Sequence, residues 1–183
     1  MSEPAAHRLP GDRLPAEEIA SMLRVDHAGE YGATRIYAGQ LDVLGRGRMA
    51  GVVRQMAEAE GRHLARFDAL LRERKVRPTL LHPLWTVAGY ALGAATALLG
   101  ERAAMACTVA VEEVIDEHYR RQAEILEGEE PALREAILSF RDDEIVHRDV
   151  AMAHGAEEAP GYDLIDAVVK TGSRIAIWLS TRL

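Results

Sequence analysis

Two segments of the chain carry the same short motif, a glutamate followed three positions later by a histidine. The pairs are Glu60 with His63 and Glu144 with His147. On an α-helix, residues three apart lie on one face, with their Cβ atoms about 5–6 Å apart. A carboxylate and an imidazole placed in this way can bind one metal ion together. One such pair arises easily by chance in a helical chain rich in acids, so one motif alone is weak support for a metal site.

Each motif has a further glutamate upstream at a similar distance. Glu30 lies 30 residues before Glu60, and Glu112 lies 32 residues before Glu144. Each interval is one helix plus a turn, so the pattern predicts two helical hairpins that each supply Glu and then Glu-x-x-His. When two such hairpins pack as a four-helix bundle, they form the ligand set of ferritin-like di-iron and di-manganese proteins. Spacing alone leaves both Glu112 and its neighbour Glu113 open as the ligand on that helix.

The charge of this ligand set matches two divalent metal ions. Four carboxylates carry four negative charges, and burying them together without cations is costly. Oxygen and imidazole ligands suit Fe(II) or Mn(II) rather than a metal that prefers thiolates. Cys107, the one cysteine, is out of register with the ligand face and is expected to be a small core residue. The alternative for the whole set is a coincidental group of solvated acids.

Two residues beside the motifs are candidates to support the site. Asp143 directly precedes the second motif, and we expect its carboxylate to hold His63, because metal-bound histidines usually donate their second N–H to such a group. A surface acid is the alternative. Tyr119 lies two turns after Glu112 and shares its face. Its hydroxyl either forms a hydrogen-bonded rim to the site or is satisfied within the core.

Two other histidines lie close to the upstream glutamates. His118 follows Glu112 by six residues, somewhat to the side of the ligand face, and His27 lies one turn before Glu30. Either can form a hydrogen bond at the rim of the site. We expect His118 to be structural rather than a ligand, and His27 to be half-exposed.

Helical periodicity and the placing of Gly and Pro predict an all-α fold without strands of useful length. The architecture expected is a ferritin-like four-helix bundle with an added apolar helix between the hairpins and a C-terminal amphipathic helix. The four bundle helices are predicted at about 16–44, 48–74, 101–127 and 131–154, and the last helix at 162–182. Residues 1–14 are predicted to be a flexible lead, and 15–183 a single domain.

Residues 78–100 contain no charged side chain, which raises the question of a membrane segment. Two prolines shorten the helical part, and its many Ala, Gly and Thr residues insert weakly, so a helix in the membrane interface is favoured over a span. Trp85 and Tyr90 are then expected near the headgroups, with the basic residues of 72–77 on anionic lipid. The alternative is a helix buried in the bundle or in a dimer contact. For 162–182 a membrane-facing helix and a core or oligomer helix are both open.

Composition excludes several classes of protein. Apolar residues make up 48% of the 183 residues and charged residues 28%, so the chain as a whole is not disordered. The net charge of −7 argues against a nucleic-acid binder that neutralises phosphates. A single cysteine excludes an intrachain disulfide and, with no secretory signal visible, indicates a reducing, cytoplasmic setting.

The chain resembles the demethoxyubiquinone hydroxylases, the di-iron monooxygenases of ubiquinone biosynthesis. The resemblance runs from about residue 14 to the C-terminus and includes long runs outside the ligand motifs. The matching stretches are RVDHAGEYGA at 24–33, RIYAGQ at 35–40, RPT at 77–79, PLW at 83–85, ALGA at 91–94, AMACTVAVEE at 104–113, FRD at 140–142 and RIAI at 174–177.

The resemblance implies two iron ions at a carboxylate-bridged centre, with Glu60 and Glu144 bridging and Glu112 favoured over Glu113. The ligands implied are Glu30, Glu60 and His63 for one iron, and Glu112, Glu144 and His147 for the other. The reaction implied is the O₂-dependent 3-hydroxylation of a polyprenyl 3-demethoxyubiquinol, with reducing equivalents from NADH. No glycine-rich nucleotide motif is visible in the sequence. The resemblance also favours a peripheral protein on the cytoplasmic side of the cell membrane, a homo-oligomer, and contacts with other ubiquinone-biosynthesis proteins.

Three other functions remain open at this point. A ferritin-like ferroxidase would use the same six ligands but would need no membrane surface. A non-enzymatic membrane-bound helical scaffold would tolerate loss of the ligands. A soluble di-iron hydroxylase acting on another substrate, such as a modified nucleoside, fits the acidic balance and the charge-free segment poorly.

Overall fold

A computed structural model describes residues 16–183 and confirms the all-α prediction. Its helices are α1 (Ala16–Leu44), α2 (Arg48–Arg74), α3 (His82–Leu98), α4 (Glu101–Ile125), α5 (Pro131–Ala153) and α6 (Tyr162–Ser180), with a short 3₁₀ turn at Ala156–Glu158. The predicted ends agree with these bounds to within two residues. The lead predicted over 1–14 lies outside the described residues.

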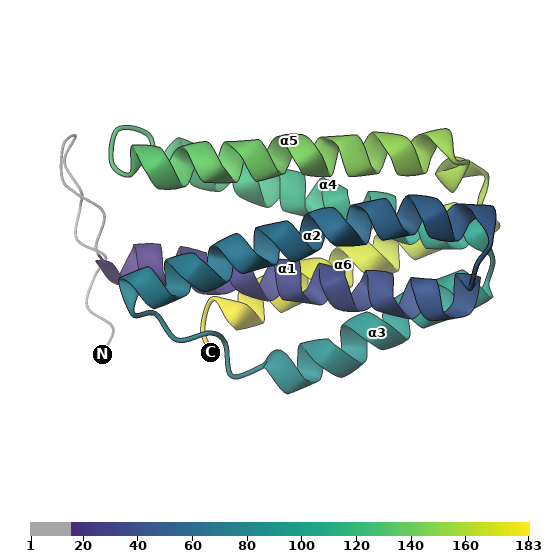
Figure 1. Cartoon of the computed structure of the whole chain (residues 1–183), viewed down its shortest axis with the longest axis horizontal. Helices are drawn as coiled ribbons and strands as arrows, with labels where there is room; N and C mark the ends of the chain where they lie inside the picture. The colour runs from purple at the N-terminus through teal and green to yellow at the C-terminus, as the bar shows by residue number, and fades with distance from the viewer. Residues whose placement is uncertain (1–15) are drawn as a thin grey trace.

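Four long helices form the bundle as two antiparallel hairpins, α1 with α2 and α4 with α5 (Figure 1). The two additional helices lie outside this bundle, α3 along α1 and α6 along α4. The hairpins contact each other much less closely than the helices within each hairpin do. The interior between the hairpins is therefore where long polar side chains from all four helices have room to meet.

The apolar core is divided into two clusters, one toward each end of the bundle. One contains Leu23 and Phe67, and the other contains Tyr37 and Val53, all of them buried. Glu30 on α1, Glu60 on α2 and Glu144 on α5 lie between the two clusters along their helices. On α4, Val111 and Ile115 of the first cluster flank Glu112. The apolar clusters fix the helices on both sides of a polar centre, which keeps that centre rigid and away from solvent.

Close helix contact explains how α3 is held on α1. A Cβ atom on Gly93 would overlap the backbone of Ile36, and one on Gly39 would overlap the backbone of Tyr90. Glycine at both positions lets the two backbones touch. The outer side of α3 stays uncovered, with Leu84 and Val87 exposed. Within residues 16–183, no helix combines the length and apolar character needed to cross a membrane.

Candidate metal centre and adjoining cavity

The structure brings the six predicted ligands together in the middle of the bundle. All six are buried, with at most 7% of any of them exposed. They form two overlapping groups whose candidate ligand atoms lie within 4.8 Å of one another. The first group is Glu30, Glu60, His63 and Glu144, and the second is Glu60, Glu112, Glu144 and His147.

Glu60 and Glu144 belong to both groups, which is the arrangement expected of bridging carboxylates. The Nδ1 atom of His63 lies 3.1 Å from one oxygen of Glu144, and Nδ1 of His147 lies 3.1 Å from the other. His147 Nδ1 is also 3.0 Å from Glu60 Oε1. Because each imidazole approaches the shared carboxylates from its own side, the geometry divides into two neighbouring positions for cations.

Two tyrosines form hydrogen bonds to Glu30 and Glu112, and each of these bonds joins α1 to α4. The Tyr37 hydroxyl on α1 donates to Glu112 Oε1 on α4, at 2.6 Å, and the Tyr119 hydroxyl on α4 donates to Glu30 Oε1 on α1. In each hairpin the tyrosine follows the upstream glutamate by seven residues. The spacing predicted a place near the site for Tyr119. Tyr37 was not predicted, although it follows Glu30 by the same seven residues.

Four carboxylate oxygens of the centre have no hydrogen bond within residues 16–183. Glu30 Oε2, Glu112 Oε2 and both oxygens of Glu60 are buried and unpartnered by hydrogen bonds within the described part of the chain. Buried polar atoms in native proteins are almost always satisfied, and an unsatisfied cluster requires an explanation such as a bound ion. Acceptor-only oxygens that converge on one point, with imidazole nitrogens beside them, fit a divalent cation.

The pKa values of the four glutamates agree with a site for cations. Burial, with repulsion from the neighbouring carboxylates, raises the pKa values of Glu30, Glu60 and Glu112. For Glu144, burial acts in the same direction, but hydrogen bonds from His147 and His63 outweigh it and lower the pKa to about 2. The four carboxylates cannot all ionise beside one another at neutral pH unless cations enter.

The contact expected between Asp143 and His63 is present. His63 Nε2 lies 3.0 Å from Asp143 Oδ2, while Nδ1 of the same ring faces the glutamates. Although burial opposes protonation of this ring, its hydrogen bonds to the glutamates raise the pKa of His63 to about 10. Asp143 lies directly before Glu144, and the corresponding position before Glu60 is Ala59. No carboxylate at that position can therefore support His147 as Asp143 supports His63. The two halves of the centre are therefore alike in ligands but differ around their histidines.

The half-exposed position expected for His27 is wrong, and the structural role expected for His118 stays a prediction. His118 is not part of either ligand group, and its Nε2 lies 3.1 Å from Asp26 Oδ1. His27 is 3% exposed rather than half-exposed, and its Nε2 lies 3.0 Å from Asp68 Oδ1 on α2. The sequence could not show this contact, since it depends on how α2 packs against α1. 

Glu113 and Cys107 lie where the family resemblance and the helix register, respectively, predicted them. Glu113 points away from the centre and pairs with Lys170 at 2.6 Å, which leaves Glu112 as the inward-facing carboxylate. Cys107 is buried in the apolar core.

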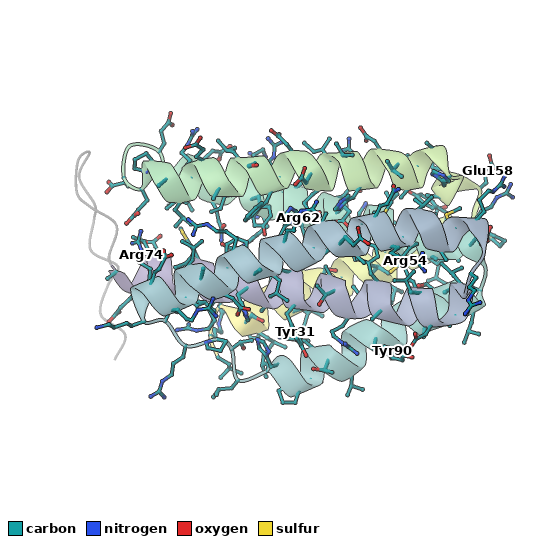
Figure 2. The ribbon with its side chains drawn as sticks, in the orientation of Figure 1. Tyr31, Arg54, Arg62, Arg74, Tyr90 and Glu158 are labelled. Atoms are coloured by element: carbon teal, nitrogen blue, oxygen red, sulfur yellow. The ribbon has the colours of Figure 1, made fainter. Side chains whose placement is uncertain are left out.

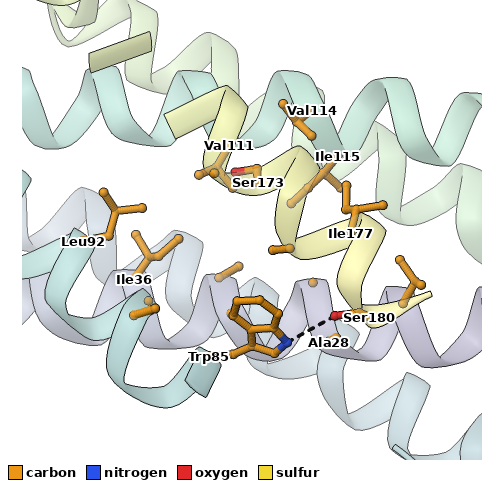
Figure 3. Close-up of a pocket in the computed structure, with 18 residues that line it drawn as sticks. Ala28, Ile36, Trp85, Leu92, Val111, Val114, Ile115, Ser173, Ile177 and Ser180 are labelled. Carbon is orange, nitrogen blue, oxygen red and sulfur yellow. Dashed lines mark hydrogen bonds between the residues drawn. The ribbon is translucent and has the colours of Figure 1, made fainter. Parts of the chain in front are cut away.

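An apolar cavity of about 310 Å³ lies beside the centre, between α1, α3, α4 and α6. Gly29 and Val111 line it, and each is the sequence neighbour of a glutamate in the centre. Trp85 forms part of the wall and donates from Nε1 to Ser180 Oγ at 3.2 Å, linking α3 to α6 (Figure 3). Trp85 therefore faces the cavity, and its expected place near the headgroups stays a prediction. The cavity was not predicted, because it depends on the packing of two helices outside the bundle.

Exposed apolar side chains lie on the outer faces of the two helices that cover the cavity. They include Leu84 and Val87 on α3 and Val168 and Ile175 on α6. Exposed apolar side chains gathered on neighbouring helices mark a candidate interaction site for a protein or a membrane. The Tyr90 hydroxyl donates to Asp42 Oδ2 at 2.7 Å in an exposed contact.

Comparisons with known proteins place the chain among proteins of one pathway. The family described as "Ubiquinone biosynthesis protein COQ7" matches residues 17–180. The chain is 54% identical over 180 residues to the 3-demethoxyubiquinol 3-hydroxylase of Rhodospirillum rubrum, covering 98% of this chain and 85% of the relative.

Eukaryotic relatives carry similar names. The chain is 49% identical over 176 residues to the NADPH-dependent 3-demethoxyubiquinone 3-hydroxylase, mitochondrial, of Homo sapiens, covering 94% of this chain and 81% of the relative. It is 40% identical over 179 residues to the 5-demethoxyubiquinone hydroxylase, mitochondrial, of Saccharomyces cerevisiae, covering 88% of this chain and 77% of the relative.

Proposed function

The chain belongs to the COQ7 family of ubiquinone biosynthesis proteins, and from this premise we propose that it hydroxylates the ring of a polyprenyl demethoxyquinol with O₂. It is a hydroxylating oxidoreductase, as its named relatives are. The observation that carries the proposal is the buried group of four glutamates and two histidines, in which four carboxylate oxygens lack a hydrogen bond from the described residues. A buried arrangement of this kind has no structural purpose without cations.

The proposed ligands of two iron ions are the six residues of the centre. Glu30, Glu60 and His63 would hold one ion, Glu112, Glu144 and His147 the other, and Glu60 and Glu144 would contact both. Iron held by carboxylates and imidazoles supplies the activation of O₂ that an aromatic hydroxylation needs. The ligand set suits manganese as well, and the choice of iron rests on the reaction.

The surrounding residues would keep the ligands in place and the centre dry. Tyr37 and Tyr119 each bind one oxygen of a glutamate, which directs the other oxygen toward the metal position. Asp143 fixes the ring of His63 so that Nδ1 faces inward. Supporting groups of this kind set both the orientation and the basicity of a metal ligand.

The apolar cavity is the proposed entry for the substrate. Its lining is almost entirely apolar, and its volume of about 310 Å³ suits part of a quinol or its isoprenoid tail rather than the whole molecule. Since Gly29 and Val111 line the cavity beside Glu30 and Glu112, a ring at its inner end lies next to the centre. The exposed apolar faces of α3 and α6 would lie on the membrane and receive the substrate from it.

The overall reaction places one oxygen atom on the ring and releases the other as water, which consumes two electrons and two protons. We propose a reduced nicotinamide dinucleotide as their source. The resemblance implied NADH, whereas the human relative is named NADPH-dependent. Peripheral binding at the cytoplasmic side of the cell membrane, a homo-oligomer and contacts with other biosynthetic proteins remain predictions.

Anaerobic titration with Fe(II) tests the ligand assignment. We expect two equivalents per chain for the unaltered protein and fewer for Glu144→Gln, because that carboxylate contacts both positions. Glu113→Gln is the matched control, since this neighbour of Glu112 pairs with Lys170 outside the centre. Two equivalents in Glu144→Gln, or a loss in Glu113→Gln, would contradict the assignment.

A further inference from the structure

A second cavity, of about 420 Å³, lies where α2 ends and the chain passes toward α3. It shares no lining residue with the apolar cavity and includes none of the proposed metal ligands. Arg72 and Lys75, from the end of α2, lie at its exposed rim. Lys75 has a left-handed backbone conformation, φ 55°, where the chain leaves the helix.

The basic residues at this rim lack acidic partners. Arg24 and Arg77 adjoin it, with Arg24 Nε donating to the carbonyl of Arg77 at 3.2 Å. Among residues 16–183, no ion pair involves these two arginines, Arg72 or Lys75. In a chain of net charge −7, four unpaired basic residues at one end form a local positive field.

Arg74, at the same end of α2, has a structural role. Arg74 forms two hydrogen bonds with the carboxylate of Glu130, at 2.9 and 2.7 Å, and so ties α2 to the start of α5. Figure 2 labels Arg74 at this end of α2, with Arg54 and Arg62 farther along the same helix. Arg72 and Lys75 lie on either side of Arg74 in sequence but take no part in such a bridge.

Asp68 is the one acid that lines the cavity, against the two cations of its rim, and it already accepts a contact from His27 Nε2 at 3.0 Å. His82, the first residue of α3, stacks on the ring of Tyr31 at 4.4 Å between centroids. No acidic residue lies in the first turn of α3 and no side chain caps it, so its positive helix end adds to the field.

Exposed apolar residues adjoin the basic rim. Pro78 lines the cavity, and two residues later Leu80 is 81% exposed. Leu84, in the first turn of α3, is 49% exposed and begins the apolar outer face of that helix. Cations beside a projecting apolar surface match the two halves of a phospholipid, a charged phosphate and an acyl chain.

We infer that this cavity holds the phosphodiester headgroup of an anionic phospholipid. Arg72 and Lys75 contact the phosphate, while Leu80 and Leu84 lie against the acyl chains. The inference rests on the proposed function, in which the substrate comes from the membrane. A lipid held here fixes the molecule so that the outer faces of α3 and α6, and the cavity between them, meet the bilayer. Free phosphate or a nicotinamide dinucleotide offers the same phosphate chemistry but leaves Leu80 uncovered.

The test is vesicle binding of the iron-loaded full chain, measured by co-sedimentation. Phosphatidylcholine vesicles are compared with vesicles that also contain phosphatidylglycerol. We expect tighter binding to the anionic vesicles, and a loss of roughly fivefold per cation in Arg72→Gln/Lys75→Gln. Binding of this variant to neutral vesicles stays unchanged, because the apolar surface is intact. Arg54→Gln/Arg62→Gln removes the same charge from α2 outside the cavity and keeps the anionic preference.

Three results would overturn the inference. The first is equal binding to anionic and neutral vesicles. The second is an equal loss of vesicle binding in both double variants. The third is binding of inorganic phosphate or NADPH that depends on Arg72 and Lys75, while vesicle binding does not depend on them. Hydroxylation of a short-tailed, water-soluble demethoxyquinol separates this inference from the proposed function. Arg72→Gln/Lys75→Gln keeps that activity. If the unaltered protein forms no product, the proposed function fails, whatever the vesicles show.

Discussion

At the residue scale, the centre is built from a repeated unit whose two copies are not identical. Each hairpin supplies an upstream glutamate, a tyrosine seven residues later, and a Glu-x-x-His motif. Only the second motif is preceded by an acid, Asp143, which reaches across to His63. Among the described residues, the structure shows no equivalent carboxylate on His147. The metal position of His63 is thus the better supported of the two.

Asp143→Asn is expected to weaken metal binding at one of the two positions. An amide in place of the carboxylate removes a charged acceptor from His63 Nε2, and loss of such a partner costs about 10- to 100-fold in metal affinity. Competitive Fe(II) titration should therefore separate into one unchanged and one weakened equivalent. Asp142→Asn, at the exposed neighbouring position, is the control. Unchanged affinity in Asp143→Asn would show that the contact has no functional weight.

At the scale of the helices, α3 depends on glycine for its place on α1. Its inner face buries only small residues, Gly93, Thr96 and Ala97, so close backbone contact replaces the interlocking of large side chains. That contact also shapes the apolar cavity, because Trp85 and its neighbours on α3 form one wall. A change that lifts α3 from α1 should therefore affect stability and substrate entry together.

Gly93→Ala is expected to lower the free energy of unfolding by about 1–3 kcal/mol, because the added methyl group overlaps the backbone of Ile36. Gly51→Ala is the matched control on α2, where a Cβ atom meets nothing within 4 Å. It should raise the free energy of unfolding by about 0.5–1 kcal/mol, since Ala is the better helix former. Denaturant unfolding of both variants measures the difference. Equal effects would contradict the close approach of α3 and α1.

Much of the fold and of the metal centre could be predicted from the sequence. The features that could not be predicted share a physical cause. Helix ends follow from local signals such as Gly45 and Pro131, and the ligands follow from spacing within and between helices. Contacts between side chains on different helices were harder to predict, because they depend on which helices pack together. The contact of Asp143 with His63 was predicted from general metal chemistry, but the contact of His27 with Asp68 was not. The cavity beside Trp85 requires the packing of α3 and α6, which no local pattern specifies.

At the scale of the whole molecule, the free energy of unfolding of the metal-free protein depends on pH. The raised pKa values of Glu30, Glu60 and Glu112 mean that the folded state holds protons that the unfolded state has released above about pH 4.5. Stability from these groups is therefore lost as pH rises through their folded pKa values. His63, raised from 6.5 to about 10, adds a loss of the same sign between those values.

The metal-free protein should therefore unfold at progressively lower temperature as pH rises from about 5 to 8, and bound metal should oppose this decline. Glu144, with a pKa of about 2, is ionised across this range and contributes no slope. Calorimetry of metal-free and metal-loaded protein at several pH values gives the comparison, with Glu60→Gln expected to flatten the metal-free curve. A gap between the two forms that stays constant with pH would be inconsistent with this electrostatic account.

The most direct test of the central claim is a single-turnover reaction under ¹⁸O₂. The iron-loaded chain is mixed with a demethoxyquinol and a reductant, and the product is analysed by mass spectrometry. We predict a hydroxylated quinol that carries one ¹⁸O atom, and no product from Glu60→Gln, which removes a carboxylate oxygen from both metal positions. Rapid consumption of O₂ with oxidised iron but no hydroxylated quinol, or product whose new oxygen comes from water, would contradict the account.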